Sequence, residues 1–197
     1  EEAARSVLEA GGVPVALGGD HSVTYPLVRA ISSHSGPPAI VHLDAHGDLY
    51  DELDGNRFSH ATPFARIMEE GSASALRQYG VRSLTAHQRE QARRFGVLAI
   101  EMRDFDTAGA VDSLPKGPVY LSLDIDVLDP AFAPGVSHHE PGGMSVREVL
   151  TLLHGLSGPI IAADVVELNP VRDVAGITAA VAAKFLKEIL GRIVGAT

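Results

Sequence analysis

The chain of 197 residues is 45% hydrophobic and 21% charged, which suits one globular domain with a sizeable core. Its formal net charge of −9 disfavours binding to nucleic acid or to an anionic membrane, because both require clustered lysine and arginine. The absence of cysteine excludes disulfides, thiolate zinc sites and a cysteine nucleophile, and it is consistent with the cytoplasmic location that we expect.

Apolar, β-rich segments alternate with helical patterns along the whole chain. The chain opens inside a helix-like pattern with no initiator methionine, so we expect the natural protein to begin earlier. Strands are predicted at residues 13–17, 39–43, 79–83, 97–102, 118–126 and 159–168. Helices are predicted at residues 22–33, 61–70, 85–95, 105–112, 145–156 and 177–190. This alternation predicts an α/β fold with a mostly parallel sheet, in a single domain over residues 1–197.

Polar side chains gather directly after four of the predicted strands. The segment "GGDHS" follows the first strand, "DAHGD" follows the second, "LDIDVLD" closes the fifth and "VELNP" closes the sixth. Open parallel sheets bind their ligands at the carboxyl ends of the strands, so we expect these side chains to face one crevice. The residues concerned are His21, Asp44, His46, Asp48, Asp124, Asp126 and Glu167.

The spacing of these residues indicates a metal site. Residues two apart in an extended segment point the same way, which groups Asp44, His46 and Asp48, and separately Asp124 and Asp126. So many carboxylates cannot all stay ionised in a low dielectric without a cation. Carboxylate and imidazole ligands without sulfur favour Mn²⁺ over structural zinc. Two cations bridged by carboxylates would use the whole set and activate a water molecule.

Several other polar residues have plainer interpretations. Asp20 is equally well explained as the N-cap of the helix at residues 22–33. His42, inside an apolar strand, is more typical of a core histidine, and Asp129 is more typical of a turn. The histidines expected on the surface are His34, His87 and His154.

The polar segments also resemble a known family. "GGDHS", "DAHGD", "SLDIDVLDPAFAPG" and "VVELNP" resemble, in this order, the signatures of the ureohydrolases, the family of arginases and agmatinases. "YDELDGNRFSHATPFARIMEEG" and "GVSHHEPGGMSVREVL" look most like plant-type arginases and their bacterial agmatinase-like relatives. The resemblance covers essentially the whole chain. It implies a three-layer α/β/α sandwich that lacks the family's N-terminal segment, and assembly of identical chains into a trimer or hexamer.

The resemblance implies two Mn²⁺ ions in each chain. By analogy, His21, Asp44, Asp48 and Asp124 would hold one ion, and His46 and Asp126 would hold the other together with Asp44 and Asp124. Asp44 and Asp124 would therefore bridge the two ions.

The resemblance further implies hydrolysis of a guanidino compound, arginine or agmatine, by a metal-bridging hydroxide, with release of urea and an amine. Asp48 and His60 would carry protons to the leaving amine, and Glu167 would orient the guanidinium group. The loop residues expected at the far end of the substrate are Asn56, Ser59, His138 and His139. Two other functions remain open: a deacylase on a related fold that holds a single metal, and a metal-binding subunit without catalytic activity.

Overall fold

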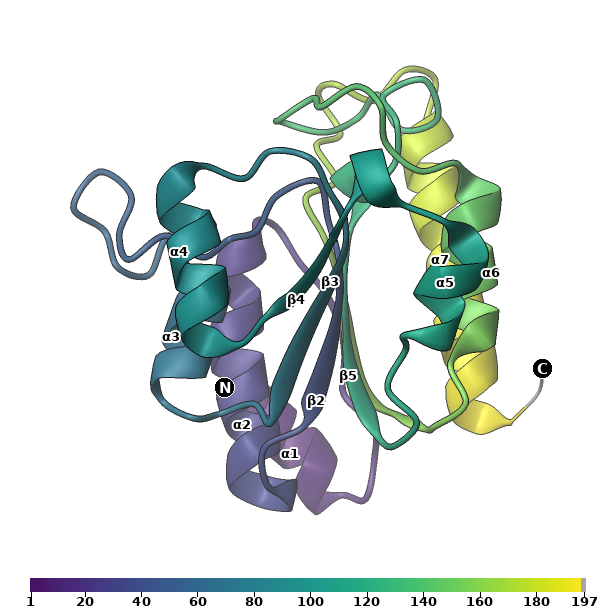
Figure 1. Cartoon of the computed structure of the whole chain (residues 1–197). Helices are drawn as coiled ribbons and strands as arrows, with labels where there is room; N and C mark the ends of the chain where they lie inside the picture. Colours follow the sequence, from purple (N-terminus) through teal and green to yellow (C-terminus); the bar gives the residue numbers. More distant parts are fainter. Residues whose placement is uncertain (196–197) are drawn as a thin grey trace.

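The computed structural model describes residues 1–195, which form three layers with a parallel sheet in the middle (Figure 1). The six strands are β1 (Val15–Leu17), β2 (Ala39–Leu43), β3 (Ala75–Val81), β4 (Leu98–Glu101), β5 (Val119–Asp124) and β6 (Ile160–Val166). Their order across the sheet is β1-β6-β5-β2-β3-β4, and every neighbouring pair is parallel. The predicted α/β fold with a parallel sheet is confirmed.

Helices cover both faces of the sheet (Figure 1). One face carries α1 (Glu2–Glu9), α2 (Thr24–Ser35), α3 (Pro63–Glu69) and α4 (Ala86–Phe95). The other face carries α5 (Thr107–Asp112), α6 (Val146–Gly155) and α7 (Ile177–Val194). Short 3₁₀ turns, His21–Val23, Met102–Asp104 and Ile125–Val127, follow β1, β4 and β5. No helix within residues 1–195 is long and apolar enough to cross a membrane.

The sheet buries apolar side chains on both of its faces. Successive strand residues point to opposite sides, so Tyr120 joins the core beneath α2 and α3, while Leu121 joins the core beneath α6 and α7. Strand β3 starts at Ala75, earlier than predicted. The prediction missed its first half because Arg77 and Gln78 interrupt the apolar pattern. Gln78 is nevertheless fully buried, and its partners are described below.

The centre of the sheet is a switch point of the topology. Strands β2 and β5 are hydrogen-bonded neighbours, with Leu43 opposite Leu123. After β2 the chain continues to α3 on one face, and after β5 it continues to α6 on the other face. Because these loops diverge, a crevice opens at the carboxyl ends of the two strands. The sequence places its densest polar segments directly at these two ends.

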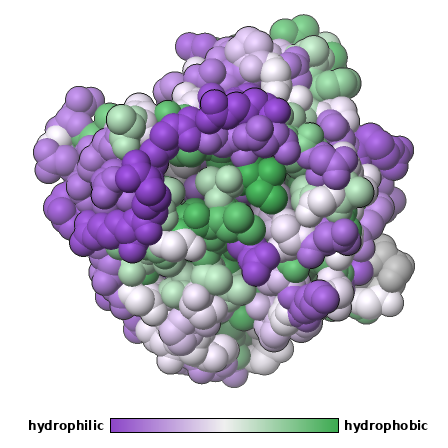
Figure 2. Space-filling model, viewed as in Figure 1, coloured by the Kyte–Doolittle hydropathy of each residue, from purple (hydrophilic) through white to green (hydrophobic). Residues whose placement is uncertain are grey.

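The sheet ends at β4 on one side, and its edge faces the viewer in Figure 1. Hydrophobic residues gather in the middle of this face, with polar residues around them (Figure 2). Leu98 in β4 is 43% exposed. This apolar edge lies away from the crevice, whose lining is polar and titratable.

Candidate metal centre

Four side chains surround one buried nitrogen at the end of the sheet. His21 Nδ1 lies 3.2 Å from Asp44 Oδ2, 3.1 Å from Asp48 Oδ2 and 3.2 Å from Asp124 Oδ2. All four side chains are buried. His21 begins the 3₁₀ turn after β1, Asp44 and Asp48 follow β2, and Asp124 ends β5. We call these four residues the inner cluster.

A second group lies beside the first and shares one residue with it. His46 Nδ1 lies 3.3 Å from Asp44 Oδ1 and 3.0 Å from Asp126 Oδ2. His46, Asp44 and Asp126 form the outer cluster. Asp44 therefore contributes Oδ2 to the inner cluster and Oδ1 to the outer cluster. Asp124 contributes Oδ2 to the inner cluster, while its Oδ1 accepts a hydrogen bond of 2.8 Å from the backbone N–H of Asp126.

The geometry of the inner cluster fits a cation better than it fits a set of hydrogen bonds. His21 Nδ1 has no hydrogen-bond partner within residues 1–195, although three carboxylate oxygens face it. Two ligand atoms that each lie about 2.1 Å from an ion, at right angles, are about 3.0 Å apart. A buried nitrogen without a partner is costly unless a cation fills the space that it faces. The His and Asp side chains present are therefore suited to hold divalent metal.

The buried negative charge of the two clusters also favours binding of a cation. Burial raises the pKa of Asp124 well above its usual range, and the charges of Asp126 and Asp44 add to this. Burial and the charge of Asp44 raise the pKa of Asp126 to about 6. Burial also opposes ionisation of Asp44, but the three histidines around it hold its pKa well below the usual range. Protons or metal ions must balance this negative charge, and a metal does so without protonating the carboxylates.

Hydrogen bonds behind His21 direct Nδ1 toward the carboxylates. His21 Nε2 lies 2.9 Å from Ser122 Oγ, and Ser122 Oγ donates over 2.8 Å to Asp164 Oδ1. Because Ser122 gives its proton to Asp164, it accepts from His21 Nε2–H, and the lone pair of His21 remains on Nδ1. Asp164 also accepts from Thr24 and Tyr120 and is fully buried. The role of Asp164 was not predictable from the sequence, since a single aspartate in an apolar strand has no distinctive spacing.

His42 is buried in β2, as expected of a core histidine, but it also contacts the site. Its Nε2 lies 2.7 Å from Asp44 Oδ2, and its Nδ1 lies 3.0 Å from Gln78 Nε2. Burial lowers the pKa of His42, which favours the neutral ring. The contact between His42 and Asp44 was not predicted from the sequence, although they lie two positions apart and strand residues two apart share a face.

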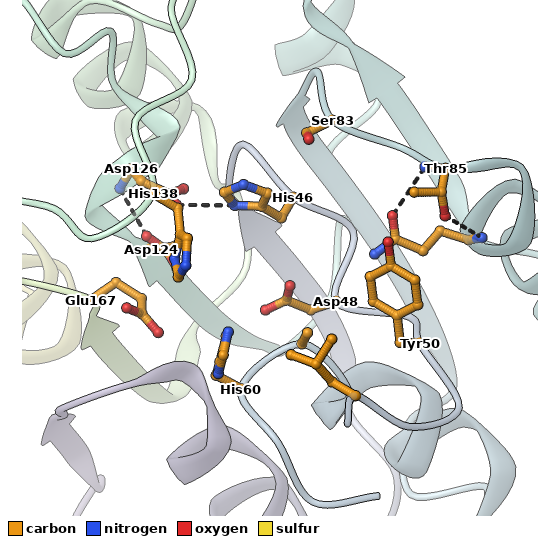
Figure 3. Close-up of a pocket in the computed structure, with 13 residues that line it drawn as sticks. His46, Asp48, Tyr50, His60, Ser83, Thr85, Asp124, Asp126, His138 and Glu167 are labelled. Atoms are coloured by element: carbon orange, nitrogen blue, oxygen red, sulfur yellow. Dashed lines mark hydrogen bonds and ion pairs between the residues drawn. The ribbon is translucent and has the colours of Figure 1, made fainter. Parts of the chain in front are cut away.

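A cavity of about 210 Å³ opens directly over both clusters (Figure 3). Its titratable lining consists of His46, Asp48, Tyr50, His60, Asp124, Asp126, His138 and Glu167. His60 and His138 stack with ring centroids 5.6 Å apart. His60 comes from the loop before α3, and Glu167 follows β6, so distant parts of the chain meet here. In Figure 3 the side chains of Asp48, His60 and Glu167 lie around one common space.

Two of these acidic residues adopt uncommon backbone conformations. Asp48 has φ of 48° and Glu167 has φ of 66°, both in the left-handed region that most residues other than glycine avoid. Glu167 is held there by two hydrogen bonds: its N–H donates to Gly19 O over 2.9 Å, and its Oε1 accepts from His21 N over 2.8 Å. Such strain is typical of functional sites, where it fixes the direction of a side chain.

Three of the predicted substrate residues do not line the cavity. Asn56 is exposed, and its Oδ1 accepts from the N–H of Phe58 on the same loop. Ser59 lies beneath His60, with its Oγ 3.4 Å from His60 Nδ1. His139 is exposed and bonds the carbonyl of Pro134, whereas its neighbour His138 does line the cavity. The contact of Asn56, Ser59 and His139 with substrate stays a prediction.

The residues with plainer interpretations behave as expected. Asp20 caps the turn at His21–Val23, where its Oδ1 accepts from the N–H of Ser22 over 3.0 Å. Asp129 accepts from the N–H groups of Ala131, Gly142 and Gly143, which closes the loop between β5 and α6. His34, His87 and His154 are exposed on helices.

The half-buried guanidinium of Arg82 anchors the same loop. It donates to the carbonyl oxygens of Asp126, Val127 and Leu128 on one side and to that of Glu140 on the other. Arg82 follows β3, so it joins the segment that carries Asp126 to the neighbouring strand end. This fixes the backbone of the outer cluster.

Comparison with known proteins identifies the family. The sequence pattern of the Arginase family matches residues 1–191. Arginase 1, mitochondrial, from Oryza sativa subsp. indica is 54% identical over 200 residues, which cover 98% of this chain and 59% of the rice protein. Guanidinopropionase from Pseudomonas aeruginosa is 42% identical over 199 residues, which cover 94% of this chain and 62% of that protein. The chain thus spans a little over half the length of these relatives.

Solved structures agree with the sequence matches. Arginase from Medicago truncatula superposes with a TM-score of 0.89 at 47% identity, over 96% of this chain and 63% of that one. Proclavaminate amidino hydrolase from Streptomyces clavuligerus superposes with a TM-score of 0.91 at 36% identity, over 98% of this chain and 68% of that one. The predicted three-layer fold and the resemblance to ureohydrolases are therefore confirmed, and the chain belongs to the arginase family of ureohydrolases.

Proposed function

We propose that this chain forms the metal-binding catalytic domain of an enzyme that hydrolyses a guanidino compound to urea and an amine, with two Mn²⁺ ions as cofactors. The inner and outer clusters would hold one ion each, and Asp44 would serve both. The observation that carries the proposal is the unpartnered His21 Nδ1, which faces three carboxylate oxygens beside a cavity. Ligands of oxygen and imidazole nitrogen without sulfur favour Mn²⁺ over structural zinc.

The chemistry of the bound metals is limited to one contribution. When bound, the divalent ions would lower the pKa of water and so supply a nucleophile at neutral pH. A guanidinium group is a weak electrophile, so without such a nucleophile the cavity residues alone would not suffice. All remaining tasks fall to side chains of this chain.

Glu167 is suited to bind and orient the cationic substrate. It lines the cavity beside Asp48 and Asp124, and one of its oxygens is fixed by the N–H of His21. Burial raises its pKa, and a guanidinium group at the cavity would favour its ionised form. A carboxylate can accept two parallel N–H bonds from the planar guanidinium, which sets its orientation.

His60 is suited to move a proton. Its ring lines the cavity together with Glu167, is only partly buried, and stacks on His138 (Figure 3). An imidazole can both accept and donate a proton, so it can carry one to a leaving group. We propose that His60 delivers a proton to the nitrogen of the leaving amine, and that Asp48 accepts one beside the inner cluster.

The names of the relatives support the substrate class. Arginase, guanidinopropionase and proclavaminate amidino hydrolase each denote an enzyme whose substrate carries a guanidino group. The negative charge around the cavity suits such a cation. The part of the substrate beyond the guanidinium would meet Tyr50, Ser83 or His138, which line the outer part of the cavity. Assembly into a trimer or hexamer remains a prediction.

The test combines metal content with a substrate panel. The metal-free protein is loaded with Mn²⁺, bound metal is counted by elemental analysis, and urea is measured with arginine, agmatine, 4-guanidinobutyrate and 3-guanidinopropionate. We expect two ions per chain and urea from at least one substrate, with His34→Ala as an unaffected surface control. Saturation at one ion would favour a mononuclear deacylase instead. Two bound ions without urea from any substrate would favour a non-catalytic metal-binding protein.

A further inference from the structure

Two buried polar residues lie behind the carboxylate that the two clusters share. His42 in β2 and Gln78 in β3 are direct cross-strand partners, and neither side chain is exposed to solvent. Val41 and Leu43, the neighbours of His42 along β2, are apolar core residues, and a buried polar pair stabilises a fold less well than an apolar pair of the same volume. Their position next to Asp44 therefore calls for a specific explanation.

The hydrogen bonds of Gln78 fix the tautomer of His42. Gln78 Nε2 lies 2.6 Å from the carbonyl oxygen of Gly47, which can only accept, so this atom must be the amide nitrogen. The second proton of the same nitrogen points to His42 Nδ1 at 3.0 Å. His42 Nδ1 is therefore an acceptor, and the proton of the neutral ring lies on Nε2. This Nε2–H donates to Asp44 Oδ2 over 2.7 Å.

The ring of His42 is also held in place by packing. Its centroid lies 4.0 Å from that of Phe64 and 5.0 Å from that of His21. The imidazole therefore cannot turn to present its other edge without displacing both neighbours. On the other side of Asp44, Oδ1 accepts from the backbone N–H of His46 over 2.6 Å. The two donors hold the carboxylate at both oxygens, with Oδ2 in the inner cluster and Oδ1 in the outer cluster.

We propose that Gln78 and His42 act as positioning residues: Gln78 fixes the tautomer of His42, His42 fixes Asp44 Oδ2, and together they set the affinity of the inner cluster for its metal ion. This inference rests on the metal pair of the proposed function. Hydrogen-bond partners behind metal ligands commonly change metal affinity by about 10–100-fold. The effect should be larger for the inner ion, because His42 contacts the inner oxygen and a backbone N–H holds the outer one.

The test uses Mn²⁺ as the probe and affinity as the readout. Mn²⁺ is titrated into metal-free protein by calorimetry, in the wild type and in a His46→Asn background that weakens the outer site. His42→Phe removes the donor but keeps the ring, and Gln78→Met keeps the length of the side chain but removes its N–H groups. We expect each to weaken the inner site by about 10–100-fold.

Two further variants separate positioning from simple packing. His42→Gln places an amide N–H near the position of Nε2 and should restore affinity to within about threefold of wild type. Gln91→Met is the matched control, because Gln91 on α4 is also a buried glutamine but donates its Nε2–H to Asp51 and does not line the cavity. We expect Gln91→Met to leave Mn²⁺ affinity unchanged, whatever its effect on the melting temperature of the metal-free protein.

The outcomes distinguish this inference from the proposed function. A wild-type protein that takes up no Mn²⁺ would overturn both. Wild-type binding with unchanged inner affinity in Gln78→Met and His42→Phe would overturn the positioning role alone. An affinity as low in His42→Gln as in His42→Phe would also overturn it. Should His42→Phe fail to fold, Gln78→Met still tests the loss of the hydrogen bond to His42, because methionine keeps the length of the glutamine side chain. His42→Gln still tests whether an amide N–H can replace the Nε2–H of histidine.

Discussion

The inner and outer clusters share Asp44 but differ in their surroundings. His21 in the inner cluster has a side chain that is only 1% exposed, whereas the side chain of His46 in the outer cluster is 23% exposed. His21 is oriented by Ser122 and Asp164 in the protein core. His46 Nε2 lies 4.0 Å from Glu140 Oε1, beyond hydrogen-bond distance. The histidine of the inner cluster is thus part of the core, and the histidine of the outer cluster forms part of the cavity wall.

This difference has a physical consequence for metal binding. A site whose ligands are fixed by buried hydrogen bonds needs little rearrangement when an ion binds. A site with a partly exposed ligand must first order that ligand, which costs free energy. We therefore expect the inner cluster to bind Mn²⁺ more tightly and to exchange it more slowly. Both clusters border the cavity, the inner one through Asp48 and Asp124 and the outer one through His46 and Asp126.

The most severe test of the comparison removes the residue that both clusters share. Asp44→Asn keeps the shape of the side chain but replaces a charged ligand oxygen with an amide nitrogen. Metal content should fall in both sites, and the rate of urea formation should fall by at least about a thousandfold. Elemental analysis and a urea assay measure the two effects. Full metal content in this variant would show that the clusters do not depend on Asp44.

His60 tests whether filled clusters are sufficient for activity. His60→Ala leaves every residue of the inner and outer clusters in place, so both ions should still bind. Turnover should fall by about 10²-fold or more, as is usual when a general acid is lost. Parallel measurement of metal content and urea release decides this point. If the variant lost its metal, the role of His60 as a proton carrier would be wrong.

His46 provides the direct contrast between the clusters. His46→Asn replaces a proposed ligand, so it should weaken the outer site by more than the about 10–100-fold expected for a partner behind a ligand, while the inner site keeps its ion. At an Mn²⁺ concentration that just saturates the wild type, the count should therefore drop from two ions per chain to one. Loss of both ions would mean that the clusters bind cooperatively and are not separable as described.

Ser122 offers the smallest and most selective change. Ser122→Ala removes the acceptor for His21 Nε2–H but leaves the outer cluster untouched. We expect the affinity of the inner site to fall by about tenfold, with no change in the outer site. Calorimetric titration with Mn²⁺ resolves the two steps. Equal weakening of both sites would contradict the assignment of Ser122 to the inner cluster.

Much of the fold was predictable because local patterns and burial agree. The six strands fall where apolar, β-rich segments end in polar residues, and only β3 begins well before its predicted start, because Arg77 and Gln78 break its pattern. The gathering of His21, Asp44, His46, Asp48, Asp124 and Asp126 was predictable too, because parallel strands bring their carboxyl ends to one edge. The loop residues Asn56, Ser59 and His139 were harder to place, since loop side chains follow their own local hydrogen bonds.

The sequence by itself determined the order of strands and helices, the residue types at the strand ends and the family to which they point. The tertiary structure decided that β2 lies between β5 and β3, which brings His42 opposite both Ser122 and Gln78. It also decided which oxygen of Asp44 faces which cluster. The reason is physical: side-chain periodicity is local and can be read along the chain, whereas pairing between strands depends on contacts between segments that are distant in sequence.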